Sequence, residues 1–165
     1  MNNLCTDISF MSLKKYGEQL CGDHVDIVQR SEDSSIVVLA DGLGSGVKAS
    51  ILSTLMYKII SAMMAEGMSI EECVRTAAAT LPVCTVRGVA YSTFTVIHII
   101  DNREAEIFQY DNPHVILLRN GRNCEYPREA VKIDEKTIFR TRIPLQEDDT
   151  FIAFSDGATH AGIGM

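Results

Sequence analysis

One stretch of about twenty residues, 47–66, most constrains the fold of this chain, because apolar residues recur in it every three or four positions. That spacing predicts a long amphipathic helix. Gly67, followed by a capping-box pair of Ser69 and Glu72, predicts that this helix ends and that a second one runs to about Thr80. Strand-type segments lie on both sides of the two helices. This order favours an α+β fold, with helices packed on largely antiparallel sheets, over alternating βαβ units.

The strand-type segments alternate apolar and polar residues or are short β-branched runs bounded by turn residues. Before the helices they cover 7–13, 25–29 and 35–40, and after them 91–100, 105–110, 115–118, 133–134, 137–143 and 151–154. Hairpin turn signals stand at 101–103 and 120–121. We find no repeat, low-complexity tract or linker, so the 165 residues are expected to form a single domain with its own core.

Charge and cysteine usage exclude several classes of protein. Lys and Arg total 15 against 22 Asp and Glu, a net charge of −7, which argues against a nucleic-acid partner. We expect no membrane span and no secretory signal, since no long apolar run and no basic, then apolar, N-terminus stand out. The five cysteines contain no CxxC pair, which favours reduced thiols in a cytoplasmic protein.

Two apolar strand-type runs end at the same dipeptide, Asp41-Gly42 and Asp156-Gly157. A carboxylate at the end of a buried strand is held in place, and the glycine lets the backbone approach a ligand. If both ends meet in one cleft, they would form an all-oxygen anionic site suited to Mg²⁺ or Mn²⁺, with Asp23 as a third candidate ligand. The alternative is that each Asp-Gly pair is only a turn, since this dipeptide is common in turns.

A glycine-rich turn, 42–46, joins one of these strands to the long helix. Such a turn can hold phosphate on helix N-terminal amides, but a Walker A loop fails here because Val47 and Ala49 replace the required Gly and Ser/Thr. A relaxed dinucleotide fingerprint fits the glycines, yet no second parallel strand with an acidic residue follows. Tight packing of the strand against the helix is the structural explanation for these glycines.

Five blocks of the sequence resemble the PP2C-type metal-dependent protein serine/threonine phosphatases, and in particular their bacterial SpoIIE-like branch. They run in order from about Gly22 to Gly157 and read GDHVDIV, VVLADGLGSGVKAS, YSTFTVIHIID, DNPHVILLRNG and DDTFIAFSDG. The resemblance implies a β-sandwich of two antiparallel sheets flanked by antiparallel helices. It also implies hydrolysis of phosphoserine or phosphothreonine on a protein substrate by a metal-activated water.

The resemblance further implies a site with two Mn²⁺ or Mg²⁺ ions. By position in the motifs, Asp41 would bridge the ions, Gly42 would offer its backbone carbonyl, and Asp156 and Asp23 would complete the metal shell. Asp41 and Asp156 would thus act in catalysis through metal-bound water. Lys48 stands where relatives often carry a basic residue and could position the phosphate, or it could be a solvated lysine in the first helical turn.

The sequence also departs from the family pattern. Leu43 replaces the His that the eukaryotic branch has after the first Asp-Gly, and no Leu-Pro-x-Gly block is evident around 130–134. The family has another metal-binding Asp on a later strand, whereas this chain stops at Met165. We therefore expect a PP2C-like domain over 1–165 that is incomplete at its C-terminus.

Three hypotheses follow from these features. The first is a cytoplasmic protein phosphatase in signalling, acting on a phosphoprotein. The second is a catalytically impaired phosphatase-fold module that binds a regulatory partner, suggested by Leu43 and the missing carboxylate. The third, a nucleotide-binding protein that uses 42–46, has the weakest support. The substrate, regulatory input and oligomeric state are not indicated by the sequence.

Overall fold

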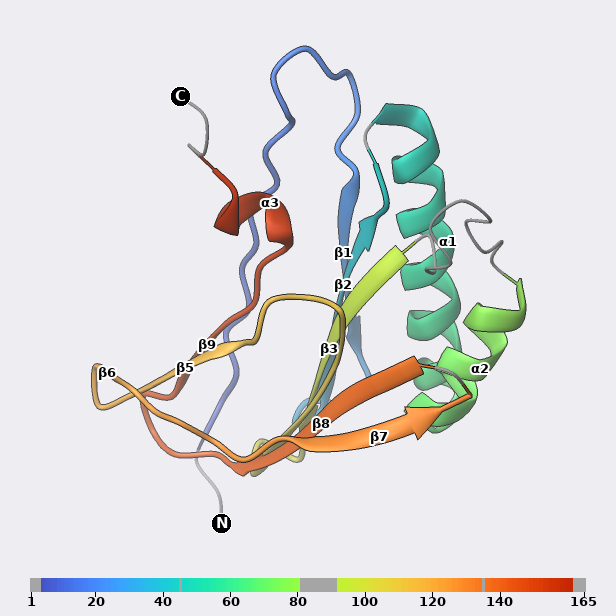
Figure 1. Cartoon of the computed structure of the whole chain (residues 1–165). Coiled ribbons are helices and arrows are strands. Elements are labelled where there is room, and N and C mark those ends of the chain that lie inside the picture. Colours follow the sequence, from blue (N-terminus) through green and yellow to red (C-terminus); the bar gives the residue numbers. More distant parts are fainter. Residues whose placement is uncertain (1–3, 45, 81–91, 135, 162–165) are drawn as a thin grey trace.

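The computed structural model describes residues 4–44, 46–80, 92–134 and 136–161. Two short strands open the fold, and two helices follow them (Figure 1). These first elements are β1 (Asp23–Gln29), β2 (Ser35–Gly42), α1 (Gly46–Ala65) and α2 (Ile70–Thr80). The later elements are β3 (Ser92–Ile100), β4 (Glu104–Tyr110), β5 (Ile116–Arg119), β6 (Arg122–Asn123), β7 (Glu129–Ile133), β8 (Lys136–Pro144), β9 (Thr150–Ile152) and α3 (Asp156–Thr159).

The strands form two antiparallel sheets. The larger one has six strands in the order β1-β2-β3-β4-β8-β7, and the smaller one has three in the order β6-β5-β9. Adjacent strands β1 to β4 pair in sequence order, as short connections favour. The α+β class and the pair of antiparallel sheets are thus confirmed.

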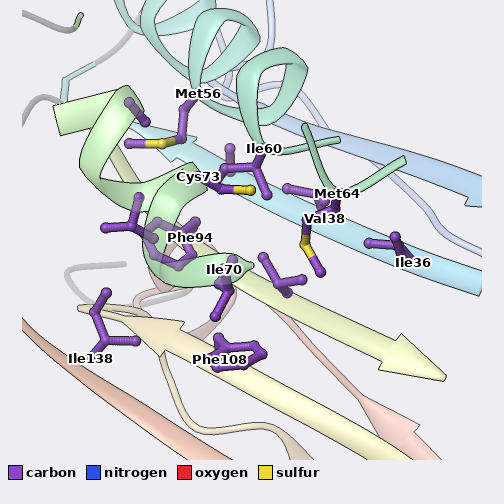
Figure 2. Close-up of a cluster of buried hydrophobic side chains, with 14 of the residues drawn as sticks. Ile36, Val38, Met56, Ile60, Met64, Ile70, Cys73, Phe94, Phe108 and Ile138 are labelled. Atoms are coloured by element: carbon purple, nitrogen blue, oxygen red, sulfur yellow. The ribbon is translucent and has the colours of Figure 1, made fainter. Parts of the chain in front are cut away.

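The helices α1 and α2 cover one face of the large sheet, and one hydrophobic core lies between the helices and this sheet (Figure 2). Leu52, Met56, Ile60 and Met64 recur every fourth residue of α1, and all are buried. They pack on inward side chains of the central strands such as Phe94. The apolar face of α1 is wider than this buried stripe, because three other apolar residues remain exposed: Val47, Ile51 and Leu55.

Helix α1 also bears on the expectation that no segment could span a membrane. It has 20 residues and a mean hydropathy of 1.2, so by length and composition it is long and apolar enough to cross a bilayer. Core helices of soluble proteins meet the same criteria, and the buried stripe of α1 belongs to the core with the sheet. Helix α1 is thus a core helix of the fold. The expectation that no apolar run is long enough to span a bilayer was wrong, since α1 is long and apolar enough by length and composition.

A second core lies between the two sheets. Ile97, Ile99 and Ile107 of the large sheet pack with Leu117 of the small sheet and with Val115 just before it. Phe151 of β9 packs against the same cluster. Residues facing this core alternate with those facing the helices, since successive side chains of a strand point to opposite faces. This alternation decides which strand-end residues point into the space between the sheets.

Most predicted elements are found, with three differences. Residues 7–13 form no strand, and Phe10, Met11 and Leu13 there are exposed, so their loose alternation has no buried face to serve. The weak strand signal at 133–134 marks only the end of the longer β7. The two-residue β6 and the single-turn α3 were missed, because elements so short carry no periodicity.

Candidate metal centre

Asp23 and Asp41 are directly opposite partners where β1 and β2 meet. Side chains of directly opposite residues in an antiparallel pair lie on the same face, about 4.5–5.5 Å apart at Cβ. On β2, Val37 packs into the core between the sheets, and Asp41 follows it by an even number of residues. Both carboxylates therefore face the space between the two sheets, at its edge.

The segment after β9 brings a third carboxylate to this edge. Ser155 donates a hydrogen bond from its Oγ to Oδ2 of Asp23 at 2.6 Å, across 132 residues of sequence. Ser155 is the N-cap residue of α3, yet its side chain makes no capping bond to that helix. Asp156, the first residue of α3, lies close enough to Asp41 to interact with it by hydrogen bonding and by charge. The structure thus joins all three predicted Asp residues.

The electrostatics of the cluster are dominated by Asp41. Burial raises the pKa of its carboxyl to about 8, and hydrogen bonding with Asp23 and Asp156, together with their negative charges, adds to the rise. Burial and like charges both disfavour the ionised form of a carboxyl group. A cation placed among the three would offset this unfavourable charge, so the cluster is arranged to gain from one.

The donor set fits a hard divalent cation. Its side-chain ligands would all be carboxylate oxygens, and the Gly42 carbonyl stands in the same turn, which suits Mg²⁺ or Mn²⁺ better than zinc. Within the described ranges, no three His, Cys, Asp or Glu side chains already surround one point at metal-binding distance. An ion held by all three carboxylates would therefore require a different arrangement of these side chains.

Gly42 is required by packing, as the strand-to-helix explanation predicted. A Cβ on this residue would lie 2.0 Å from the backbone oxygen of Ala49 in α1, a separation that no side chain can occupy. The Gly42 amide donates to the carbonyl of Gly22 at 3.2 Å, which fastens the end of β2 to the start of β1. Gly44 and Gly46 have φ of 98° and 73°, values that favour glycine.

Two neighbouring positions complete the comparison with the sequence. Lys48 is exposed in the first turn of α1, and its role toward phosphate stays a prediction. His24, the next residue of β1 after Asp23, points to the helix side, where its Nδ1 lies 2.8 Å from Ser53 Oγ and its ring stacks on Tyr57. It differs from Asp23 because adjacent strand residues face opposite ways.

Sequence reasoning missed Ser155 as a residue of the site. Ser155 directly precedes the Asp156-Gly157 pair in the DDTFIAFSDG block, so the signal is present in the sequence, but only Asp156 is predicted as a ligand. A serine ahead of a helix normally caps that helix. Its bond to Asp23 depends on a contact between distant segments, which no local pattern can show.

Comparisons with known proteins bear on the family and the fold of this chain. The profile of the family described as Stage II sporulation protein E (SpoIIE) matches residues 31–164. Among curated proteins no match was found. A solved structure of the PP2C phosphatase domain of SpoIIE from Bacillus subtilis, with a fragment of its regulatory domain, is similar with a TM-score of 0.78 at 18% identity. The match covers 94% of this chain but 46% of that one, so this chain spans less than half of that relative.

Two further structures share the fold. RsbX in complex with magnesium matches with a TM-score of 0.68 at 21% identity, covering 89% of this chain and 72% of that one. The RsbU and RsbW domains of Rv1364c from Mycobacterium tuberculosis match with a TM-score of 0.68 at 17% identity. This match covers 87% of this chain and 42% of that one. At these identities the structures show the fold alone, whereas the family profile covers most of the sequence. The chain belongs to the SpoIIE family and has the PP2C phosphatase fold.

Proposed function

We propose that this chain is a protein serine/threonine phosphatase domain that hydrolyses phosphoserine or phosphothreonine on a protein substrate. One observation carries the proposal: Asp23, Asp41 and Asp156, from three separate segments, meet at the edge between the two sheets. Family membership supports the phosphatase class. Two half-buried carboxylates, Asp23 and Asp41, with the exposed Asp156 beside them, are unfavourable for folding alone, which favours a functional reason for their placement.

We propose that the site holds two Mg²⁺ or Mn²⁺ ions through Asp23, Asp41, Asp156 and the Gly42 carbonyl. The similar RsbX structure contains magnesium, which supports the choice of a hard divalent ion. When bound, such ions activate water and neutralise the charge of a phosphoryl group. The number of ions is part of the proposal.

The chain's own residues prepare this site in two ways. Ser155 holds one oxygen of Asp23 and so restricts how that carboxylate can turn. Asp41, with its pKa near 8, holds a proton near neutral pH, and that proton must leave as a cation binds. Asp156 is exposed, so the site opens to solvent and a phosphorylated side chain of another protein can reach it.

A cytoplasmic location belongs to the same proposal. The described cysteines, Cys5, Cys21, Cys73 and Cys124, are all free thiols. Free thiols are typical of reducing compartments.

The test compares phosphopeptide hydrolysis by the wild type and by Asp41→Ala in the presence and absence of Mn²⁺. Asp26→Ala is the control, because Asp26 lies on the neighbouring strand β1, where its Oδ2 is 4.0 Å from Lys58 Nζ on the helix side. We expect Mn²⁺-dependent release of phosphate that Asp41→Ala abolishes and Asp26→Ala keeps. Neither metal binding nor hydrolysis would favour the impaired phosphatase-fold module, and equal hydrolysis by the wild type and Asp41→Ala would overturn the assignment.

A further inference from the structure

Behind the three carboxylates lies a buried polar cluster centred on Asn112, the second residue after β4. Thr93 donates from its Oγ1 to Asn112 Oδ1 at 2.8 Å, and Asn112 donates from its Nδ2 to Thr95 Oγ1 at 3.1 Å. Asn112 is only 8% exposed and Thr95 only 1%. An amide with both ends bonded in a buried place has one favourable orientation, so it fixes the two threonines relative to itself.

A second buried amide continues the cluster toward the small sheet. Gln109 donates from its Nε2 to the carbonyl of Pro113 at 2.7 Å and accepts at its Oε1 from the amide of Val115 at 3.3 Å. Its Nε2 also lies 3.5 Å from Thr95 Oγ1. The turn that carries Asn112 is therefore held on both sides and cannot easily shift away from β3.

The cluster contacts β3, which is the strand paired with the Asp41 strand β2. Thr93 on β3 is the direct register partner of Asp41 on β2, so the two side chains share the face between the sheets. Ser92, fully buried beside it, donates from its Oγ to the backbone carbonyl of Asp41 at 2.8 Å. A displacement of the start of β3 would therefore move Asp41.

We propose that Asn112 is a positioning residue of the metal centre, acting on Asp41 through Thr93 and the start of β3. The inference rests on the proposed function, and it gives a role to the DNPHVILLRNG block, which supplies none of the predicted ligands. Asn112 is not itself a ligand. Removing a residue that orients a metal ligand without itself binding the metal commonly weakens metal affinity by about tenfold to a hundredfold.

The test measures Mn²⁺ affinity by calorimetry in Asn112→Ala, Thr93→Val and Thr93→Ser. Thr141→Val is the matched control, because Thr141 is a buried strand threonine on β8 whose Oγ1 donates to the Pro127 carbonyl, three strands away from β2. We expect Asn112→Ala and Thr93→Val to weaken Mn²⁺ binding about tenfold or more, Thr93→Ser to restore it, and Thr141→Val to change it less than twofold.

Amide hydrogen exchange without metal gives an independent measurement. Asn112→Ala, which removes two hydrogen bonds, and Thr93→Val, which removes one, should lower the protection of amides at 41–42 and 92–95. Thr141→Val, which also removes one hydrogen bond, should lower protection near 139–143 instead. Unchanged Mn²⁺ affinity in Asn112→Ala and Thr93→Val would overturn the inference. If the wild type binds no Mn²⁺, the proposed function fails, and the exchange pattern alone then decides whether Asn112 holds Asp41.

Discussion

Asp41 shows how single residues of this chain serve the site at a cost to stability. In the unfolded chain its carboxyl ionises near the ordinary pKa of about 3.9. In the folded chain burial and the neighbouring Asp23 and Asp156 raise that pKa to about 8. Between these values the folded state holds a proton that the unfolded state has lost, so stability falls as pH rises through this range. The residue therefore destabilises the metal-free protein near neutral pH.

Asp41→Asn should stabilise the metal-free protein near neutral pH, because it removes the unfavourable carboxylate but keeps its size. We expect a gain of about 1–2 kcal/mol, less than the full pKa shift implies, since solvent reaches the cluster and reduces the repulsion. Denaturant unfolding in a chelator at about pH 7–8 measures it. Asp26→Asn serves as the control, and a loss of stability in Asp41→Asn would contradict the electrostatic argument.

Gly42→Ala should be strongly destabilising, because its Cβ would lie 2.0 Å from the Ala49 backbone oxygen and α1 would have to move. We expect a loss of about 3 kcal/mol or more. Gly157→Ala is the matched control at the other Asp-Gly pair, since its Cβ would meet only Ser155 Oγ at 3.8 Å. Thermal melting of both variants checks this, and a small loss in Gly42→Ala would show that the helix can shift.

At the scale of elements, an ion pair fastens β5 to the turn before β9. Arg119 donates to both oxygens of Asp149 at 2.7 Å, and the Asp149 side chain is only 3% exposed. The Gln146 amide also donates to Asp149. The small sheet has only three short strands, so this two-bond pair is a large share of what positions β9 and the Ser155-Asp156 segment that follows.

The pair predicts a loss of stability in acid. The hydrogen bond from Arg119 lowers the pKa of Asp149 below its ordinary value, so its stabilisation is present above about pH 4 and is lost as pH falls through the lowered value. Asp149→Asn should cost about 1–3 kcal/mol near neutral pH and make the acid limb of the stability curve shallower. Unfolding curves from about pH 2 to pH 7 test it, with Asp148→Asn as the control. Parallel curves for wild type and Asp149→Asn would contradict the role of the pair.

At the scale of the whole molecule, the candidate metal centre is a junction between the two sheets. Asp23 and Asp41 belong to the large sheet, whereas Asp156 follows β9 of the small one. One polar link between these sides is the bond from Ser155 to Asp23. A cation bound by all three carboxylates would add a second link and oppose separation of the sheets at this edge.

Mn²⁺ should therefore stabilise the small sheet more than the large one. At a hundred times its Kd, a bound ion adds about 2.7 kcal/mol to the stability of the folded state. Hydrogen exchange should show the largest gain in protection at 150–159 and at 41–42, and a chelator should reverse it. Asp41→Ala should show no gain. Uniform protection of both sheets would indicate that the ion does not join them at this edge.

The sequence by itself determined the local elements and the identity of the acidic residues. Helical spacing, the Ser69–Glu72 capping box and β-branched runs act over a few residues, and the capping bonds of Ser69 and Glu72 are present as predicted. The paired Asp-Gly motifs and Asp23 could be chosen in advance because their chemistry is local. The resemblance to a known family extended this to the fold and the phosphatase class.

Only the tertiary structure decided which of these residues meet and what holds them. Ser155 contacts Asp23, and Asn112 bonds to Thr93 beside Asp41, across segments far apart along the chain. The raised pKa of Asp41 likewise depends on carboxylates from other segments. They depend on strand register and on burial, which are collective results of packing two sheets and two helices. The segment at 7–13 shows that local alternation is not sufficient for a strand. Its alternation predicted one, but among the described residues no partner strand covers it.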